Sequence, residues 1–310
     1  MVLELITPDG LLLRRDAVEG GYDDNYLARQ VKSGFIVRIR QGAYALASVW
    51  DIADARKRQW LLSMAAMLQY DDQVALSHDS AAVVWDGPDH GLDLSAAHLT
   101  HFDGSGRRSA KLVHHEGGIL LDDISRRRGH WITSPGRTVL DVASIRGLET
   151  GVVVGDDFVH RGLATVEEMR ILAERMDCWP NTLALRLVLD LIDGRSESVG
   201  ETLVRLLCRN MRLPRPELQW EVRDRRGRLL GRVDFAWPQH QLLGEFDGKA
   251  KYLRLRRPGE TIEQTVLREK KREDDIREAS GCRMIRFTWP DIFRPERTAD
   301  RLLAMFDAAA

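Results

Sequence analysis

Four charged residues in the last third of the chain have the types and spacing of a site that could hold a divalent cation. Glu245, Asp247 and Lys249 alternate with glycine and phenylalanine, and side chains two positions apart share one face of a β-strand. Asp234 lies in the preceding strand-like run, and a short turn lets it approach the same face. Like charges on paired strands destabilise a sheet. Such a face is therefore either fully solvated or neutralised by a divalent cation.

The elements around these residues alternate between helical and strand patterns. A helix, three strands, a helix, a strand and a final helix are predicted from the apolar periodicity and from the Pro and Gly turns. Their predicted bounds are 199–211, 218–223, 229–237, 241–249, 262–279, 284–287 and 291 onward. This order would place Asp234 and the Glu245–Lys249 segment on adjacent strands between two helices.

The segments "RVDFAWPQHQLLGEFDGKAKY" and "REDDIREASGCRMIRFTWPDI" resemble the PD-(D/E)XK nucleases, in particular bacterial domains related to the very-short-patch-repair endonucleases. The resemblance covers about residues 196–307. It implies an αβββαβα core of the restriction-endonuclease type and a metal-dependent cut in a nucleic acid. The chain shows no zinc-ligand set and no clear aromatic wedge, so repair of mismatches is not implied.

The resemblance also assigns roles to the charged residues. Hard oxygen ligands hold Mg²⁺ or Mn²⁺, and the metal activates water and polarises the phosphoryl group. Asp234 and Asp247 are the expected direct ligands, and Glu245 would hold a second metal or a metal-bound water. Lys249 would orient the attacking water or stabilise the transition state.

Two further residues have a catalytic and a structural interpretation. Glu201 matches the acidic position on the first helix of the family, but Ser198 to Glu201 is equally a capping box. Gln264, near the start of the charged helix, would touch the site or a phosphate, or it is a solvated helix residue. The basic residues after the catalytic strand are expected to contact the DNA backbone, or to form a solvated loop; they are Lys251, Arg254, Arg256 and Arg257.

The first 50 residues have the order of a winged helix-turn-helix. A helix candidate over 11–18 is followed by a second, capped by Asp23 or Asp24 and ending before Gly34. Two short strands then flank a turn at Gln41-Gly42. The second helix would enter a DNA groove and the wing would contact phosphates, whereas the alternative is a small helical domain with ordinary surface arginines. The candidate DNA-binding residues are Asn25, Tyr26, Arg29, Gln30, Lys32, Arg38 and Arg40.

The segment "LARQVKSGFIVRIRQGAYAL" is similar to the N-terminal domain of the AbiEi-type abortive-infection antitoxins. A weaker similarity continues through "LSHDSAAVVWDG" and "ITSPGRTVLDVAS", to about residue 165. The motifs are structural, so the resemblance implies architecture and a regulatory setting. A cognate toxin is an expected partner if the chain acts as such an antitoxin.

Residues 51–190 are predicted to form a mixed α/β middle domain. Helices are expected over 52–68 and 79–85 and from Ser134-Pro135, with strands over 96–102 and 110–115. Five histidines invite a metal-site interpretation, but their spacing fits no standard ligand pattern, and capping or solvated strand positions are the alternative; they are His78, His98, His101, His114 and His115.

Composition limits the class of protein. The chain has 310 residues, 44% hydrophobic and 30% charged, with a net charge of −1, which suits two or three soluble domains and argues against a histone-like polycation. Three cysteines without a CxxC pair predict no disulfide framework. The sequence shows no membrane-length apolar run and no secretory signal, so a cytoplasmic location without a membrane partner is expected.

We therefore predict an α/β protein, α+β overall, with a winged helix at residues 1–50, a middle domain at 51–190 and a nuclease-like domain at 191–310. The expected function is a Mg²⁺- or Mn²⁺-dependent DNA endonuclease or nickase, directed by the winged helix and acting in defence against mobile DNA. A second copy of the chain is an expected partner for cutting both strands. The alternative is an antitoxin-like transcriptional regulator whose nuclease fold is only a scaffold, and an RNA substrate is a third option.

Overall fold

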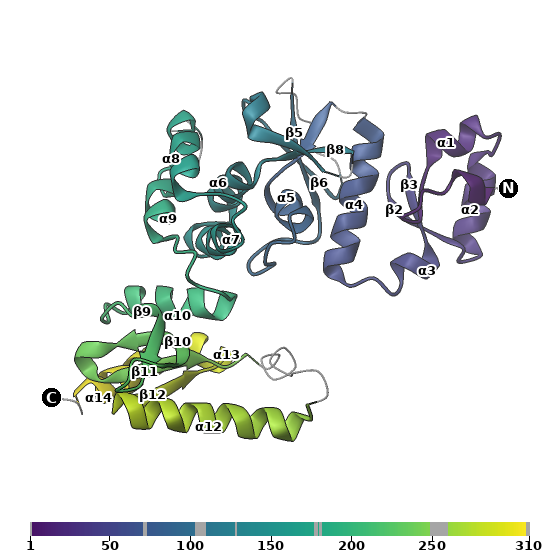
Figure 1. The fold of residues 1–310 in the computed structure, drawn as a ribbon. Coiled ribbons are helices and arrows are strands. Elements are labelled where there is room, and N and C mark those ends of the chain that lie inside the picture. The colour runs from purple at the N-terminus through teal and green to yellow at the C-terminus, as the bar shows by residue number, and fades with distance from the viewer. Residues whose placement is uncertain are drawn as a thin grey trace. The chain divides into compact units, whose positions relative to one another are not determined.

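The structure is a computed structural model that describes residues 2–70, 73–102, 110–127, 129–176, 179, 182–248 and 260–307. Helices and strands are mixed along the chain, and the protein is α/β, as predicted (Figure 1). The chain divides into two compact units, Met1–Ile192 and Asp193–Ala310. Within the described ranges, no helix is both long and apolar enough to cross a membrane.

The first unit begins with a small helical and sheet module. Its elements are a 3-10 helix Val2–Leu5, β1 Leu11–Leu13, α1 Arg14–Glu19, α2 Asp24–Lys32, β2 Ile36–Arg40 and β3 Ala43–Leu46. The strands form an antiparallel sheet in the order β1-β3-β2. Leu11–Leu13 is a strand and not the start of the predicted helix, because all three leucines are buried and pair with β3.

α2 and the wing, which β2 and β3 form, lie where the local sequence signals predicted them. The Asp23 carboxylate accepts a hydrogen bond of 2.7 Å from the backbone N–H of Tyr26 and caps α2. Gly42 turns the chain between β2 and β3 with a φ of +72°, a conformation that favours glycine. Leu12, Leu27 and Ile36 join the module into one small core.

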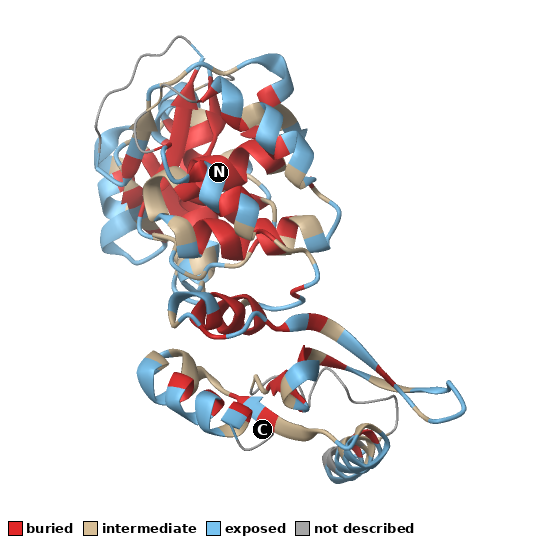
Figure 2. Cartoon of the chain, turned by 90° about the vertical axis from the view of Figure 1, so that its left-hand side faces the viewer, coloured by how far each residue is buried: buried red, intermediate tan, exposed pale blue. Residues whose placement is uncertain are grey.

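A five-stranded mixed sheet is the centre of the rest of this unit, in the order β6-β5-β4-β8-β7. The elements are α3 Ala47–Trp50, α4 Ala55–Tyr70, β4 Val74–Leu76, α5 His78–Val84, β5 Ala97–His101, β6 Leu112–His115, a 3-10 helix Leu121–Asp123, β7 Ile124–Arg127, β8 His130–Thr133, α6 Pro135–Arg146, α7 Leu148–His160, α8 Val166–Arg175 and α9 Leu185–Leu191. The described residues add β4, β7 and β8 to the two predicted strands. Buried positions, red in Figure 2, fill the interior of this unit.

The second unit has the predicted αβββαβα order. Its elements are α10 Val199–Asn210, β9 Glu217–Arg223, β10 Leu229–Trp237, a 3-10 helix Pro238–His240, β11 Leu242–Phe246, α12 Ile262–Ser280, β12 Arg283–Phe287, α13 Trp289–Ile292 and α14 Pro295–Asp307. The sheet order is β12-β11-β10-β9, with β11 and β12 parallel and the other pairs antiparallel. β11 ends at Phe246, three residues earlier than predicted.

Apolar clusters cover both faces of this sheet. Phe235 and Phe246 pack in a cluster with α10 and α14, and Val233 and Leu243 pack in another with Ile276 of α12. The contact between α10 and β11 is close at Gly200, where an added Cβ would lie 2.1 Å from the Phe246 ring. This approach brings the first turn of α10 against the end of β11.

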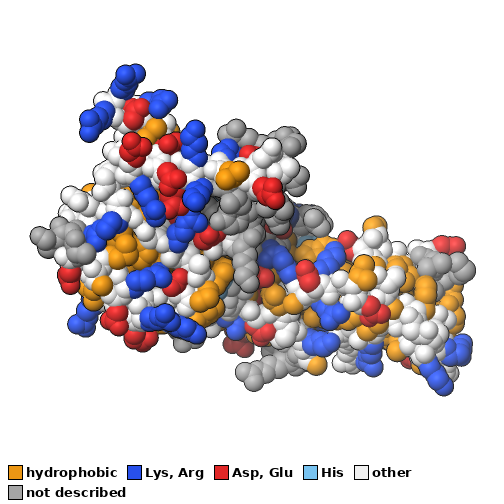
Figure 3. Space-filling model, turned by 90° about the horizontal axis from the view of Figure 1, so that it is seen from below, with side chains coloured by type: hydrophobic (Ala, Val, Ile, Leu, Met, Phe, Trp, Pro, Cys, Tyr) orange, Lys and Arg blue, Asp and Glu red, His pale blue; other side chains and the backbone are white. Residues whose placement is uncertain are grey.

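Charge is mixed over the face of the molecule in Figure 3. Lys and Arg side chains lie among Asp and Glu side chains there, with apolar side chains between them. This mixture agrees with the net charge of −1. Any attraction for nucleic acid must therefore come from local groups and not from the charge of the whole protein.

Candidate functional site

The carboxylate of Asp234 connects β10 to the end of β11. Its Oδ2 accepts a 2.7 Å hydrogen bond from the backbone N–H of Phe246, which stands between Glu245 and Asp247. Asp247 follows directly after β11, and its backbone N–H donates to the Phe287 carbonyl at 2.7 Å. Three of the predicted carboxylates therefore lie on or beside two hydrogen-bonded strands at one end of the sheet.

Glu201 adds a fourth carboxylate from the first turn of α10. It is 7% exposed and accepts hydrogen bonds from the Glu197 N–H at 2.9 Å, the Ser198 hydroxyl at 2.7 Å and the Gln219 amide at 2.8 Å. Burial raises the pKa of Glu201 to about 7, and the negative charge of Asp234 adds to the rise. Ser198 also caps α10 by accepting from the Glu201 N–H, so the capping contact and the proximity to Asp234 occur together.

Two arginines hold the remaining carboxylates. Arg272 Nη2 donates to Glu245 Oε1 at 2.6 Å, and Arg286 Nη1 donates to Asp247 Oδ2 at 3.3 Å. Arg286 also pairs with Glu273 on α12. α12 is rich in charged residues. Arg272 points to the sheet because it lies one turn before Ile276, which is buried against the sheet.

These residues can be compared with what a divalent cation requires. Hard carboxylate oxygens suit Mg²⁺, and a cation beside Glu201 and Asp234 would relieve the repulsion that raises the Glu201 pKa. Among the described residues, however, no group of three or more His, Cys, Asp or Glu side chains is placed to hold a metal ion. The oxygen donors of Glu201 and Asp234 have the right chemistry for a divalent cation, but they are two ligands and not a full set. Glu245 and Asp247 could act as further ligands only if they exchanged their arginine partners for the cation.

The other predicted residues of this site divide into two groups. Gln264 is exposed, and its side-chain oxygen accepts from the Thr261 N–H at 2.9 Å, so its observed contact is a helix cap. The remaining five lie outside the described residues; they are Lys249, Lys251, Arg254, Arg256 and Arg257.

Three residues of the site were missed in the sequence. Gln219 donates to Glu201 from within β9 with a φ of +55°, and nothing in the sequence distinguishes it from an ordinary strand residue. Arg272 looks like one of many charges on α12. Arg286 is opposite Glu245 through the parallel register of β11 and β12, which the sequence alone does not give.

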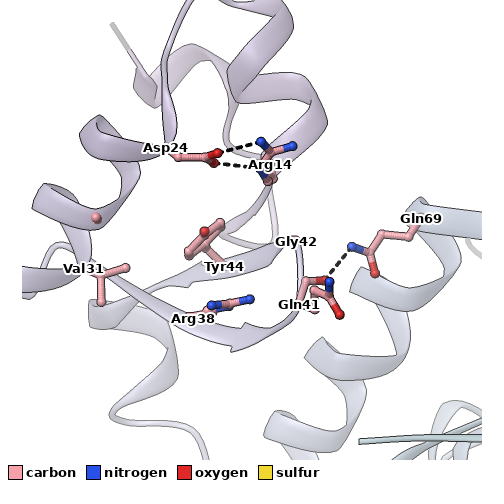
Figure 4. Close-up of a pocket in the computed structure, with 9 residues that line it drawn as sticks. Arg14, Asp24, Val31, Arg38, Gln41, Gly42, Tyr44 and Gln69 are labelled. Carbon is pink, nitrogen blue, oxygen red and sulfur yellow. Dashed lines mark hydrogen bonds and ion pairs between the residues drawn. The ribbon is translucent and has the colours of Figure 1, made fainter. Parts of the chain in front are cut away.

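The winged-helix module presents most of its predicted DNA-binding residues at the surface. Asn25, Arg29 and Lys32 of α2 and Arg38 of β2 are exposed. A cleft of about 780 Å³ lies between α2 and the wing, with Arg38 on its wing side and the Arg14–Asp24 ion pair at 2.7 Å on the other (Figure 4). Tyr26 is half-buried against Tyr22, and Gln30 is half-buried as well.

The sequence predicted that the wing presents Arg40 to DNA phosphates, but Arg40 makes a different contact in the structure. Its guanidinium hydrogen-bonds to Gln69 of α4, and burial lowers the pKa of Arg40. The Gln69 amide also donates to the Gln41 carbonyl at 3.0 Å, as Figure 4 shows. Arg40 therefore attaches the wing to α4. Simple alternation would give Arg38 and Arg40 the same face, but the register of β2 against β3 shifts between these two residues, and such an irregularity redirects a side chain.

His98 and His101 of β5 are buried and not at solvated strand positions, whereas His114 and His115 of β6 are half-buried. His98 Nδ1 lies 2.9 Å from His115 Nε2, and His101 Nε2 lies 2.7 Å from His114 Nδ1. All five residues of β5 are buried, since this strand lies between β4 and β6 and under α4 and α5. Alternation along such a strand gives no solvated face, which is why the expectation was wrong.

Comparison with known proteins adds relatives but no activity. No family model matches the chain. The chain is 26% identical over 269 residues to two uncharacterized proteins of Mycobacterium tuberculosis, MT2308 of strain CDC 1551 / Oshkosh and Rv2248 of strain ATCC 25618 / H37Rv. Each match covers 81% of this chain and 91% of the relative. Because neither unit alone contains that share of the chain, the similarity to these mycobacterial proteins extends across both units.

Proposed function

We propose that the protein is a metal-dependent DNA endonuclease or nickase whose winged-helix module binds the substrate. The observation that carries the proposal is the pairing of the Asp234 carboxylate with the Phe246 N–H at 2.7 Å, beside the buried Glu201. Like-charged carboxylates that crowd at the end of two strands are costly without a cation. The αβββαβα order around them supports the same proposal.

In this proposal each residue has one task. Asp234 and Asp247 would hold a Mg²⁺ or Mn²⁺ ion, with Glu245 and Glu201 as further acidic groups, and Lys249 would orient the attacking water. A bound metal would supply charge neutralisation at the phosphate and lower the pKa of water. The Phe246 N–H holds Asp234 in position, and the Gln219 amide does the same for Glu201. Such positioning contributes to the rate because it requires no rearrangement during the reaction.

One observation favours a second function, that of a regulator or antitoxin without nuclease activity. Arg272 and Arg286 already neutralise Glu245 and Asp247, so these carboxylates are compatible with a stable sheet in the absence of a metal. The exposed winged-helix residues would then be the functional surface, and a toxin would be the protein partner. The two functions make opposite predictions for DNA cleavage.

Supercoiled plasmid and linear single-stranded DNA, each incubated with Mg²⁺, Mn²⁺ or EDTA, distinguish these functions. We expect metal-dependent nicking or cutting by the wild-type protein, and a loss of about 100-fold or more in Asp234→Asn and Lys249→Ala, the magnitude typical of a lost electrostatic group. Asp234→Asn is a sharp test because the asparagine oxygen can still accept from Phe246. The matched control is Asp275→Asn, an exposed position on α12, which should cut at the wild-type rate.

Two results would contradict the nuclease. One is wild-type protein that binds duplex DNA but cuts neither substrate with either metal. The regulator would then be the better supported function. The other is cleavage that Asp234→Asn retains, which would place the activity elsewhere or in a contaminant. A parallel digest of a single-stranded RNA decides whether the substrate is DNA or RNA.

The winged-helix contribution to DNA binding has its own prediction. Arg29→Ala and Arg38→Ala should each weaken duplex binding and reduce the slope of log K against log salt by about 1, because each exposed guanidinium that meets a phosphate releases about one counterion. Arg40→Ala should leave the slope unchanged, since Arg40 is bound to Gln69. Fluorescence anisotropy over a salt series measures the slope for all three variants. Equal slopes for Arg38→Ala and wild type would show that the wing does not contact DNA phosphates.

A further inference from the structure

Two strands of the second unit extend past the end of their neighbour. β11 ends at Phe246, whose backbone N–H is held by Asp234 of β10. Away from β11, β10 reaches back to Leu229, and β9 stays paired with it there, with Leu229 opposite Arg223. Residues 219–232 therefore form a two-stranded β9–β10 arm that begins beside the candidate site and extends beyond the end of β11.

This arm carries a local excess of positive charge. It contains five arginines and two acids, a net charge of +3, whereas the whole chain has a net charge of −1. All five arginines are exposed; they are Arg223, Arg225, Arg226, Arg228 and Arg232. A guanidinium group binds phosphate oxygens through two parallel hydrogen bonds. The charge and the residue type of the arm therefore fit the phosphate backbone of a nucleic acid.

The acids near the arm hold its arginines only weakly. Three surface ion pairs occur; they are Arg223 with Glu221 at 2.6 Å, Arg228 with Asp224 at 3.1 Å, and Arg232 with Glu197. The arginine side chains in these pairs are 50% or more exposed, and such pairs contribute at most about 1 kcal/mol. Arg225 and Arg226, at the tip, have no ion pair with another described residue. A phosphate therefore meets two uncompensated arginines and can replace the partners of the others.

The tip of the arm is a preformed turn. Asp224 Oδ1 accepts hydrogen bonds from the backbone N–H groups of Arg226 at 2.9 Å and Arg228 at 3.0 Å. Gly227 completes the turn with a φ of +79°. Ordering a loop on binding costs free energy, and local hydrogen bonds that fix the turn beforehand reduce that cost.

One face of the arm continues the face that carries the candidate carboxylates. Arg232 lies two positions before Asp234 on β10, so the two side chains share a face of the strand. The partner of Arg232 is Glu197, next to the cap of the helix that carries the buried Glu201. The opposite face packs on α12 at Val222. A substrate held at the carboxylates would therefore meet Arg232 first and the arginines of the tip last.

We propose that the β9–β10 arm binds the phosphate backbone of duplex DNA beside the position of the cut. A two-stranded ribbon is an element that the major groove of a duplex admits. Six residues separate Arg228 from Asp234, a length of roughly 20 Å along a strand, which matches about six nucleotides of one DNA strand. The inference rests on the proposed DNA substrate and adds a second contact surface to that of the winged helix.

Binding is tested without cleavage, in EDTA, with full-length protein and a fluorescent DNA duplex over a salt series. The double variant Arg225→Ala with Arg226→Ala should reduce the slope of log K against log salt by about 2, because each lost phosphate contact retains about one counterion. At about 0.1 M salt its binding should weaken by about tenfold or more. The matched control is Arg209→Ala, an exposed arginine at the C-terminal end of α10 and outside the arm, which should keep the wild-type slope.

Asp224→Asn tests the same surface with the opposite sign. The asparagine oxygen can still accept from the two N–H groups of the turn, but Arg228 loses its ion pair and the arm gains one positive charge. Binding of the duplex should therefore become tighter by about threefold or more at about 0.1 M salt. A role of the turn in folding alone would not produce this gain.

The outcomes separate the arm from the nuclease. A wild-type slope in the double arginine variant, or wild-type affinity in Asp224→Asn, would overturn the arm, as would wild-type protein that does not bind duplex DNA. Plasmid cleavage with Mg²⁺ is measured on the same proteins. Cleavage together with an unchanged slope would remove the arm alone, whereas a reduced slope in a protein that cuts no DNA would support the arm and contradict the nuclease.

Discussion

Replacing Arg137 with methionine should lower the free energy of unfolding of the first unit by about 3–5 kcal/mol, the usual cost of removing one partner from a buried ion pair. Arg137 is 3% exposed and holds Asp141 and Asp123 through separate nitrogens. Without the guanidinium, the Asp141 carboxylate, 1% exposed, loses the side-chain donor to its Oδ1 in a region of low polarity. Asp123, 3% exposed, loses one of two arginines and keeps its ion pair with Arg175. Because methionine keeps most of the side-chain volume, the loss of stability comes from the missing charge and hydrogen bonds and not from poorer packing.

A surface arginine provides the control for this prediction. Arg170 pairs with Asp190 at 2.8 Å, but the two side chains are 45% and 60% exposed, and Arg170→Met should cost less than about 1 kcal/mol. The double variant Arg137→Met with Asp141→Leu should recover part of the loss, because it removes the carboxylate that has lost its arginine partner. Chemical denaturation at pH 7 gives all three values. A loss in Arg137→Met no larger than that in Arg170→Met would show that the buried network contributes little.

The second large effect is a loss of stability in acid that depends on His98. Burial lowers the pKa of His98 from 6.5 to about 4, so between these pH values the unfolded chain binds more protons than the folded one and stability falls as the pH falls. For this histidine the loss between pH 7 and pH 5 is about 2 kcal/mol. His115 acts in the same direction, and Asp141 acts in the opposite direction because burial raises its pKa to about 6.

Because opposing groups titrate together, the test compares variants and not absolute stabilities. His98→Gln should lose about 2 kcal/mol less than wild type between pH 7 and pH 5. His90→Gln, at a partly exposed surface position paired with Glu149, should follow the wild type. Guanidinium chloride midpoints at the two pH values measure the difference. An equal loss of stability between pH 7 and pH 5 in wild type and His98→Gln would mean that His98 is not held neutral in the folded protein.

Local features of the sequence determined most of the second unit and the winged-helix module. Helix caps such as Asp23, the glycines at turns and the apolar alternation of Phe235 and Phe246 act between near neighbours in the chain. The face shared by Glu245 and Asp247 follows from the same alternation. Where periodicity was weak, as at Leu11–Leu13, the prediction failed because burial and pairing with β3 decided the conformation.

Only the tertiary structure decided which charges meet. The parallel register of β11 and β12 places Arg286 beside the end of β11, where it donates to Asp247, and the packing of α12 brings Arg272 to Glu245. The covering of β5 by neighbouring strands and helices turned expected surface histidines into buried pairs. These contacts join residues that are between about 15 and 40 positions apart. The sequence determined the types of residue and the faces on which they lie, whereas register and burial, which depend on the whole fold, determined their partners and their protonation.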